Sequence, residues 1–394
     1  MPHYKYLVIG GGMTADAAIE AIRQADPTAA VGLIGAESSP PYNRPPLSKA
    51  LWKGKPLESI WRGTERRGAT LHLGRTARTL DVAGHRVVDD HGIEYTWTKA
   101  LLAIGGAPRR LPVGGDDIIY FRSVDDYTRL RHLAEHGQRF AVIGSGFIGS
   151  EIAAALAMNQ KEVVLLSLER GICERLLPRT LSAFLVDVYR EHGVQFWGGE
   201  AVADVTRQDG RYLVTVGSGR TVAADGVIAG IGLAPNVDLA RAARLRVGNG
   251  VVVDEQLRAG HPDVYAAGDV AEFYNPALDT RMRVEHEDNA NVMGRAAGCA
   301  MAGRPDPYHH LPFFYSDLFD LGYEAVGVLD ARLETVEDWK EPNRTGVVYY
   351  LQRERVRGVL LWNTWGQVDA ARALIAEQGP FRAANLKGRL PAST

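Results

Sequence analysis

Two glycine-rich turns of one pattern constrain the fold of this chain more than any other feature. The first follows the apolar segment Tyr6–Ile9 and reads Gly10-Gly11-Gly12-Met13-Thr14-Ala15, with Glu37 after the next apolar segment. The second follows Phe140–Ile143 and reads Gly144-Ser145-Gly146-Phe147-Ile148-Gly149, with Glu169 downstream. Each copy predicts a strand, a tight turn, a helix, a second strand and then an acidic residue.

Each part of this pattern serves the binding of a dinucleotide. The first glycine permits the turn, the second lets the backbone approach a pyrophosphate, and the third small residue lets the helix pack on the strand. The phosphates then lie at the positive helix N-terminus, and the acid accepts hydrogen bonds from a ribose. One copy alone also suits an ordinary strand-turn-helix. Two correctly spaced copies predict an α/β chain with two Rossmann-like domains that holds two adenine dinucleotides.

Composition excludes several other classes of protein. The 394 residues predict two or three domains, and a net charge of −2 with 23% charged residues argues against a nucleic-acid binder. No apolar run approaches the roughly 18 residues that span a bilayer. Met1 lies a few residues before the first strand, so we expect no leader segment and a cytoplasmic protein.

The chain offers little for thiol or metal chemistry. Cys173 and Cys299 are the only cysteines and form no C-x-x-C pair, which disfavours electron relay through a disulfide. His309 and His310 are adjacent, and neighbouring side chains of a strand point to opposite faces. We therefore expect no metal site.

The arrangement of apolar segments indicates an internal duplication. After each dinucleotide unit an apolar strand ends in a Gly and a Pro, at Gly105–Pro108 and at Gly232–Pro235. From His310 onward the pattern favours antiparallel strands and a terminal helix over Val368–Glu377. We expect four segments: one dinucleotide-binding domain over 1–112 and 240–308, a second over 113–239, and a C-terminal α+β domain over 309–394.

Several motifs together resemble the FAD-dependent pyridine nucleotide-disulfide oxidoreductases, in particular bacterial ferredoxin reductases and apoptosis-inducing factor. The motifs lie at Pro41–Lys49, Tyr265–Asp269, Arg283–His286, Phe313–Leu318, Gly322–Ala325 and Val359–Asn363. The resemblance covers essentially the whole chain. It implies an FAD domain interrupted by an NADH domain, followed by a C-terminal domain that covers the flavin.

The resemblance also implies roles for individual residues. Lys49 and Glu151 would form a catalytic ion pair near flavin N5, in which the lysine stabilises negative charge on the reduced flavin. Arg44 and Arg122 would contact the FAD pyrophosphate. The expected FAD-binding residues are Gly10, Gly12, Met13, Thr14, Ala15, Glu37, Arg44, Lys49, Ala77, Arg122, Asp269, His286 and Tyr315. The expected NADH-binding residues are Gly144, Gly146, Phe147, Ile148, Glu169, Arg175, Gly232, Glu285 and Glu324, and Asn363 completes the set of cofactor-binding residues.

Two departures and one preference refine this interpretation. Tyr315 stands where the family usually has Trp against the flavin, and only a short acidic link over Leu333–Asn343 replaces the long insertion of the eukaryotic relatives. Glu169 repels a 2′-phosphate, so NADH is favoured over NADPH, although Arg170 and Arg175 lie close by in sequence.

The resemblance implies hydride transfer from NADH to FAD and then electron transfer to an acceptor such as a ferredoxin. Residues 44–78 contain nine basic and two acidic residues, which favours docking of an acidic iron–sulfur protein. The alternative is an NADH-responsive redox sensor like apoptosis-inducing factor, which forms a stable charge-transfer complex of reduced FAD and NAD. Reduction of a quinone or of monodehydroascorbate is a third interpretation. The sequence is compatible with a monomer and with a homodimer.

Overall fold

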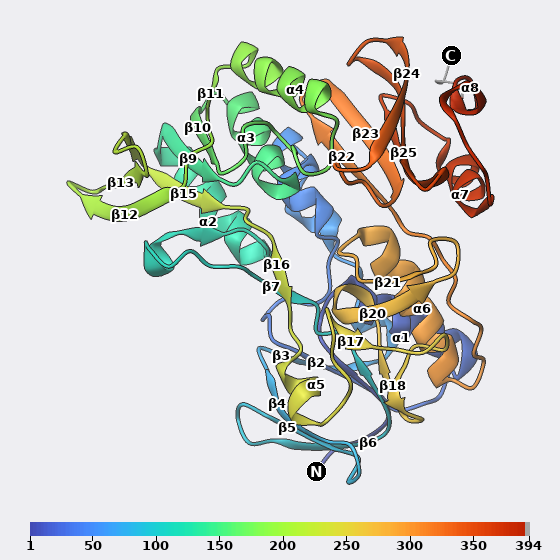
Figure 1. The fold of residues 1–394 in the computed structure, drawn as a ribbon. Coiled ribbons are helices and arrows are strands. Elements are labelled where there is room, and N and C mark those ends of the chain that lie inside the picture. The colour runs from blue at the N-terminus through green and yellow to red at the C-terminus, as the bar shows by residue number, and fades with distance from the viewer. Residues whose placement is uncertain (391–394) are drawn as a thin grey trace. The chain divides into compact units, whose positions relative to one another are not determined.

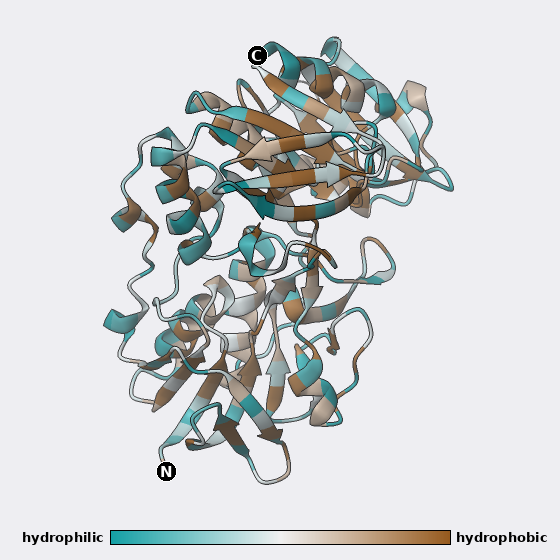
Figure 2. Cartoon of the chain, turned by 90° about the vertical axis from the view of Figure 1, so that its left-hand side faces the viewer, coloured by the Kyte–Doolittle hydropathy of each residue, from teal (hydrophilic) through white to brown (hydrophobic). Residues whose placement is uncertain are grey.

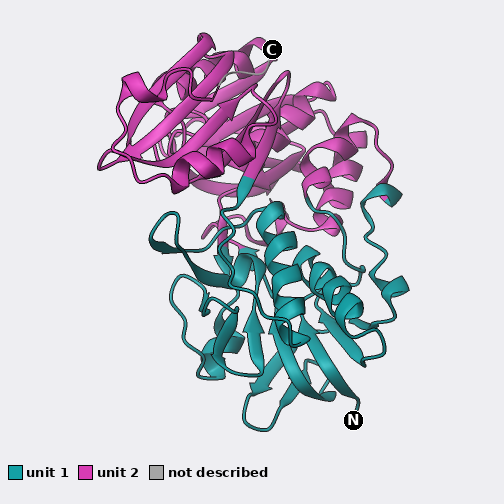
Figure 3. Ribbon diagram, turned by 90° about the vertical axis from the view of Figure 1, so that its right-hand side faces the viewer, with its two compact units in different colours: residues 1–44, 58–107, 234–313 teal, residues 45–57, 108–233, 314–394 magenta. Residues whose placement is uncertain are grey.

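The computed structural model describes residues 1–390 and divides them into two compact units, shown in Figure 3. Unit 1 comprises residues 1–44, 58–107 and 234–313, and unit 2 comprises residues 45–57, 108–233 and 314–394. The chain passes between the units through β7 (Gly106–Pro108) and β16 (Leu233–Pro235), which pair with each other. Each unit contains one parallel sheet, which confirms the predicted α/β class with two Rossmann-like domains (Figure 1).

The main sheet of unit 1 has the strand order β18-β19-β6-β1-β2-β3, and β4 and β5 extend from β6. Its strands are β1 (His3–Ile9), β2 (Val31–Gly35), β3 (Thr70–Leu73), β4 (Ala77–Asp81), β5 (Arg86–Asp89), β6 (Glu94–Leu102), β18 (Arg258–His261) and β19 (Val264–Ala266). β1, β2, β3, β6 and β19 run parallel. β2, β19 and the last residues of β1 and β6 are buried and mostly apolar, as in a parallel sheet that is covered on its faces. A smaller sheet holds β17 (Val251–Val252), β20 (Ala271–Asn275) and β21 (Thr280–Met282).

Two helices from opposite ends of the sequence pack closely in unit 1. These are α1 (Met13–Ala25) and α6 (Glu287–Met301), and the short α5 (Asp238–Ala242) lies against β4. A Cβ atom on Gly294 would come within 2.4 Å of the Thr14 carbonyl oxygen, and one on Gly298 within 2.3 Å of the Ala18 carbonyl oxygen. The two glycines of α6 therefore allow its backbone to lie directly on α1.

Unit 2 contains a parallel sheet with the order β11-β10-β9-β15-β8. Its strands are β8 (Ile119–Tyr120), β9 (Arg139–Ile143), β10 (Glu162–Ser167), β11 (Val194–Gly198) and β15 (Gly226–Ala229), and its helices are α2 (Val124–His136), α3 (Phe147–Met158) and α4 (Arg179–Glu191). A separate antiparallel sheet holds β12 (Val202–Gln208), β13 (Arg211–Val216) and β14 (Thr221–Ala224). The segment 45–57 forms the 3₁₀ helices η1 (Pro45–Ser48) and η2 (Ala50–Lys53).

The C-terminal part of unit 2 is a five-stranded sheet with the order β22-β23-β26-β25-β24. Its elements are β22 (Phe313–Leu318), β23 (Leu321–Gly327), β24 (Glu334–Glu341), β25 (Thr345–Gln352), β26 (Arg355–Trp362), α7 (Val368–Ala376) and α8 (Ala383–Leu386). Its central strands β23, β25 and β26 are predominantly hydrophobic and buried. Brown, hydrophobic stretches lie along strands of the chain in Figure 2. The expectation of a mere link over Leu333–Asn343 was wrong, because this stretch forms the edge strand β24, whose charged residues face outward beside the buried Val336. His309 and His310 lie outside any strand, so the expected alternation of their side chains does not apply.

Candidate functional site

The first glycine turn joins β1 to α1 in unit 1 and has the geometry of a phosphate cradle. Gly10 has φ +117°, and a Cβ atom there would lie 2.1 Å from the Ala103 carbonyl oxygen, so only glycine fits. Gly12 has no atom within 4 Å of its Cβ position and begins α1 without a side-chain cap. The N-terminus of α1 is therefore uncapped and its N-cap residue leaves space beside it, which suits the pyrophosphate of a dinucleotide. Met13, Thr14 and Ala15 form the first turn of this helix.

Glu37 and Arg44, both expected to contact FAD, are brought together by an ion pair in unit 1. The Tyr42 hydroxyl donates to Glu37 Oε2 at 2.6 Å and accepts from Arg44 Nη1 at 2.9 Å. Although desolvation opposes the charge, Glu37 raises the pKa of Arg44. The acid at the end of the dinucleotide motif is therefore held in place by two side chains of the following loop.

The turn around Asp269 and the segment before α6 form a second polar group in unit 1. Arg283 Nη1 donates to the Asp269 carbonyl oxygen at 3.0 Å and pairs with Glu285 at 2.8 Å. His286 directly precedes α6. Desolvation by the surrounding protein lowers the pKa of His286 to about 4, against the raising effect of nearby Asp269, so the imidazole is neutral at pH 7. Ala77 is the first residue of β4.

The second glycine turn, between β9 and α3 in unit 2, repeats the first. Gly144 has φ +99°, and a Cβ atom there would lie 2.5 Å from the Gly230 carbonyl oxygen. Gly146 has open space at its Cβ position and begins α3 without a side-chain cap. Phe147 and Ile148 open this helix, and 38% of the Ile148 surface is exposed. This turn also suits a pyrophosphate.

Glu169 follows β10, as the second copy of the motif predicts, and Arg175 lies beside it. Arg175 Nη2 is 2.5 Å from Glu169 Oε1, while the Ser167 hydroxyl donates to Glu169 Oε2 at 3.0 Å. The side chain of Arg175 is 78% exposed. The structure thus brings together the two residues whose charges bear on the choice between NADH and NADPH.

Lys49 and Glu151 form a buried ion pair in unit 2, with 2.7 Å between Lys49 Nζ and Glu151 Oε1. Only 12% of the Lys49 side chain and 2% of the Glu151 side chain are exposed. Two hydroxyls complete the environment of the carboxylate: Ser316 donates to Oε1 at 2.6 Å and Ser48 donates to Oε2 at 2.5 Å. Lys49 Nζ also lies 5.3 Å from the centre of the Tyr315 ring.

Sequence reasoning missed both serines. Each is the neighbour of an expected site residue, since Ser48 precedes Lys49 and Ser316 follows Tyr315. That adjacency was the available signal.

The other expected residues of unit 2 have more varied surroundings. Burial raises the pKa of Glu324, and its Oε2 has no hydrogen-bond partner among the described residues. Asn363 is engaged by the fold, since its Oδ1 accepts the Gly322 N–H at 2.7 Å and its Nδ2 donates to a backbone carbonyl. Gly232 has φ +91° and accepts a backbone hydrogen bond at its carbonyl. The backbone N–H of Arg122 donates to Asp126 ahead of α2.

Most basic residues of the segment 44–78 form ion pairs within the protein. Its ion pairs with acidic residues are Arg44 with Glu37, Lys49 with Glu151, Arg62 and Arg67 with Asp16, and Arg66 with Glu65. Asp16 is fully buried and also accepts the Thr64 hydroxyl at 2.5 Å. Lys53, Lys55 and Arg78 are exposed and belong to no ion pair among residues 1–390. The net positive charge offered to a partner is therefore smaller than the sequence suggests.

Comparison of this sequence with models of protein families gives two matches. Residues 4–294 match the family model of pyridine nucleotide-disulphide oxidoreductases. The chain belongs to this family. Residues 297–345 match a second model, the C-terminal domain of mitochondrion-associated apoptosis-inducing factor.

Relatives match this oxidoreductase along nearly the whole length of its chain. It is 34% identical over 96% of its chain to the ferredoxin reductase subunit of 5,5′-dehydrodivanillate O-demethylase from a Sphingobium species, of which 94% is covered. It is 33% identical over 95% of its chain to apoptosis-inducing factor 1 of Dictyostelium discoideum, of which 79% is covered. The structure of a covalent putidaredoxin reductase–putidaredoxin complex superposes with a TM-score of 0.91 at 28% identity, covering 98% of this chain and 96% of that chain.

This oxidoreductase is an FAD-dependent enzyme that uses NADH, as the family match and the ferredoxin reductase relatives show. The structure fits both dinucleotides, because each of its two motifs leaves an uncapped helix N-terminus and an open second glycine. Among the described residues no helix is long and apolar enough to cross a membrane.

Proposed function

We propose that this oxidoreductase transfers electrons from NADH to a ferredoxin. The observation that carries the proposal is the buried carboxylate of Glu151, which binds Lys49 and two serine hydroxyls. Such a network holds one positive charge at a defined place, as a site that stabilises a developing negative charge requires. The ferredoxin reductase among the relatives, and the putidaredoxin complex among the solved structures, support the choice of acceptor.

Lys49 and Glu151 have distinct roles in this proposal. When bound, NADH supplies the hydride and FAD supplies the ring that accepts it. Lys49 stabilises the negative charge that this transfer creates, and Glu151 fixes the position of the ammonium group. Ser48 and Ser316 are positioning residues that hold the carboxylate. For each NADH oxidised, one proton is released and two one-electron acceptors are reduced.

The two glycine turns support a separate binding domain for each dinucleotide. We propose that FAD binds at Gly10 and Gly12 and NADH at Gly144 and Gly146, with the domain limits expected at 112, 239 and 308. The other residues proposed for FAD are Met13, Thr14, Ala15, Glu37, Arg44, Ala77, Arg122, Asp269, His286 and Tyr315. Those proposed for NADH are Phe147, Ile148, Glu169, Arg175, Gly232, Glu285 and Glu324, and Asn363 holds the loop beside Gly322.

The proposal predicts an acidic ferredoxin, because exposed lysines remain near Lys49 in the sequence. Lys53 and Lys55 lie on and just after η2, and both are exposed. Long-range attraction between such lysines and an acidic partner raises the association rate and weakens with salt.

Anaerobic stopped-flow spectroscopy tests the proposal. The enzyme is reduced with one equivalent of NADH and mixed with an acidic [2Fe–2S] ferredoxin at low and at high salt. Rapid bleaching of the flavin, followed by transfer that slows at high salt and in Lys53→Glu/Lys55→Glu, is the expected result. Bleaching without transfer to ferredoxin at either salt concentration would refute the ferredoxin acceptor.

A redox-sensor function is the second candidate, favoured by the match of residues 297–345 to the C-terminal domain of apoptosis-inducing factor. The same experiment separates the two. A sensor predicts slow bleaching, a lasting long-wavelength absorption band and slow reoxidation by either ferredoxin or air. A reductase predicts turnover with ferredoxin.

A further inference from the structure

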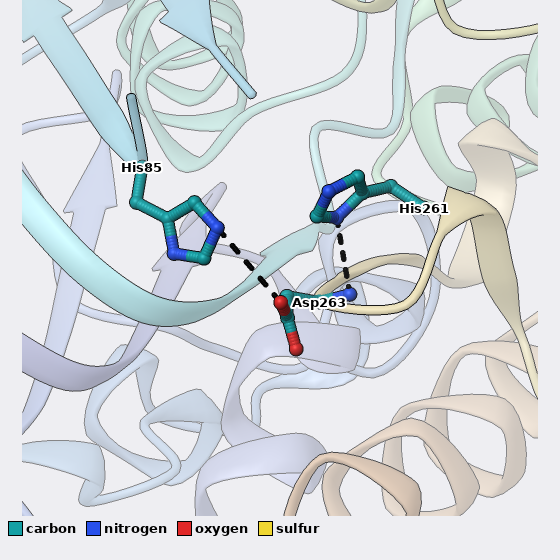
Figure 4. Close-up of side chains that lie close together, drawn as sticks. All are labelled: His85, His261 and Asp263. Carbon is teal, nitrogen blue, oxygen red and sulfur yellow. Dashed lines mark hydrogen bonds and ion pairs between the residues drawn. The ribbon is translucent and has the colours of Figure 1, made fainter. Parts of the chain in front are cut away.

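Two histidines and an aspartate gather beside β6 in unit 1, outside the residues proposed for either dinucleotide (Figure 4). Strand register explains why they meet. β5 pairs with the first part of β6, with Arg86 opposite Thr96, and β19 pairs with its last part, with Val264 opposite Ala100. Both strands therefore begin beside the middle of β6. His85 directly precedes β5 and Asp263 directly precedes β19, so the two residues lie close together there. His261 ends β18 in the hairpin that leads to β19.

One ligand atom from each of His85, His261 and Asp263 lies within 4.8 Å of the other two. His85 Nε2 is 3.8 Å from Asp263 Oδ2. Ligand atoms around a tetrahedral zinc ion lie about 3.3 Å apart, given metal–ligand bonds of about 2.0–2.1 Å. The His85–Asp263 distance is close to that value, and rotation of the partly exposed His261 and Asp263 side chains closes the rest.

The hydrogen bonds of the two imidazoles indicate which ring nitrogens could bind a metal. His85 Nδ1 lies 3.2 Å from the Trp97 carbonyl oxygen, which can only accept, so Nδ1 carries the proton and Nε2 has the lone pair. Metal-binding histidines are typically oriented by such a bond from the other ring nitrogen to a backbone carbonyl. His261 Nδ1 accepts the Asp263 backbone N–H at 3.2 Å, so its one lone pair is engaged in this hydrogen bond, and a metal bound at Nδ1 would replace the bond.

The His85 ring is also fixed by packing. It stacks on buried Trp97 with 4.3 Å between ring centres and 11° between ring planes. The residue has φ +48°, in the left-handed region, which aims the side chain at the hairpin of His261 and Asp263. The backbone at Asp263 is held too, because its carbonyl accepts the Ala100 N–H at 2.9 Å.

We propose that His85 Nε2, His261 Nδ1 and an Asp263 carboxylate oxygen bind a zinc-class divalent cation, with water at the fourth position. Two imidazoles and one carboxylate with an open position suit Zn²⁺. The site lies about 10 Å, or three residues of β6, from Leu102. Leu102 pairs with Ile9, the residue that precedes the first glycine turn. The metal would tie the β4–β5 hairpin to the β18–β19 hairpin.

Equilibrium dialysis of the FAD-loaded protein against Zn²⁺, with metal counted by mass spectrometry, tests this site. His261→Ala and Asp263→Asn avoid the Trp97 stack, and each is expected to weaken zinc binding at least tenfold. Zinc should also raise the melting temperature of the wild type and leave that of both variants unchanged. Flavin absorbance of each variant reports folding independently of zinc.

The matched control is a second cluster, His132, Glu135 and His136, which is exposed on α2. The double variant His132→Ala/His136→Ala should bind zinc as the wild type does. Zinc binding that survives in His261→Ala and Asp263→Asn, or that disappears in the α2 double variant, would overturn the proposal. So would the absence of zinc binding by the wild type.

Discussion

Loss of the Lys49 ammonium group should destabilise unit 2 by an amount that depends on Glu151. In Lys49→Met the carboxylate, 2% exposed, keeps the two serine hydroxyls but no counter-charge. Removing one partner of a buried pair costs about 3 kcal/mol, at the low end of the usual range because 12% of the lysine side chain is exposed. With an m-value of about 3 kcal/mol per molar, that is a shift of about 1 M in the urea midpoint.

A double-mutant cycle isolates the pair. Glu151→Leu leaves two buried hydroxyls without their acceptor, which costs about 1 kcal/mol for each. The loss of unfolding free energy in Lys49→Met/Glu151→Leu should be about 2 kcal/mol smaller than the sum of the losses in the two single variants. Lys53→Met on exposed η2 is the matched control and should change stability by less than about 0.5 kcal/mol. Urea unfolding followed by circular dichroism measures all four proteins. Additivity within about 0.5 kcal/mol would refute the reasoning that the two side chains depend on each other.

The same variants separate stability from the proposed role in catalysis. Lys49→Met should slow flavin bleaching by NADH about a hundredfold while FAD stays bound, because one stabilising charge of a transition state is worth that much. Stopped-flow absorbance gives the rate and the visible spectrum gives the FAD content. Unchanged bleaching would contradict the role of Lys49 without bearing on its ion pair.

Three further predictions concern single positions. Gly146→Val should fold, since its Cβ position is open, but should raise KM for NADH at least tenfold at unchanged FAD content; Gly144→Val should instead lose folded protein, because its Cβ would meet a backbone oxygen at 2.5 Å. Burial raises the pKa of Glu324, so the folded state binds the extra proton and wild-type stability should fall as pH rises from about 4.5 through the raised pKa. Glu324→Gln should abolish this decrease in stability with pH and raise the melting temperature at pH 7. A lower melting temperature of the variant at pH 7 would contradict this prediction. Burial raises the pKa of Cys173 to about 12, so a thiol reagent should modify Cys299 first and leave NADH-driven bleaching intact, as mass spectrometry and stopped flow would show.

Much of the fold follows from local patterns of the sequence. The terminal helix expected over Val368–Glu377 is present as α7 and ends one residue earlier, and both glycine turns lie between a strand and a helix as predicted. The prediction missed α4, although Leu181, Leu185 and Val188 recur at helical spacing and are buried. It also missed β24, because an edge strand rich in charged residues lacks the apolar alternation by which strands are recognised.

The candidate site was less accessible to sequence reasoning, because its contacts join distant segments. Ser48 and Ser316 lie 103 and 165 positions from Glu151, and a serine beside a site residue has no pattern of its own. The His85–Asp263 cluster likewise depends on the register of two strands against β6. Local spacing predicts turns and helices well, but it does not say which distant strands will pair.

The glycine contacts between α1 and α6 have a consequence for the newly made protein. Residues 1–107 lack one of their packing surfaces until α6 exists, and the chain from residue 108 to the end of α6 at Met301 is roughly 200 residues long. At about 5–20 residues per second, a ribosome adds that stretch in about 10–40 s. Throughout that interval the apolar face of α1 lacks its packing partner α6, so the emerging chain exposes an apolar surface that chaperones can bind.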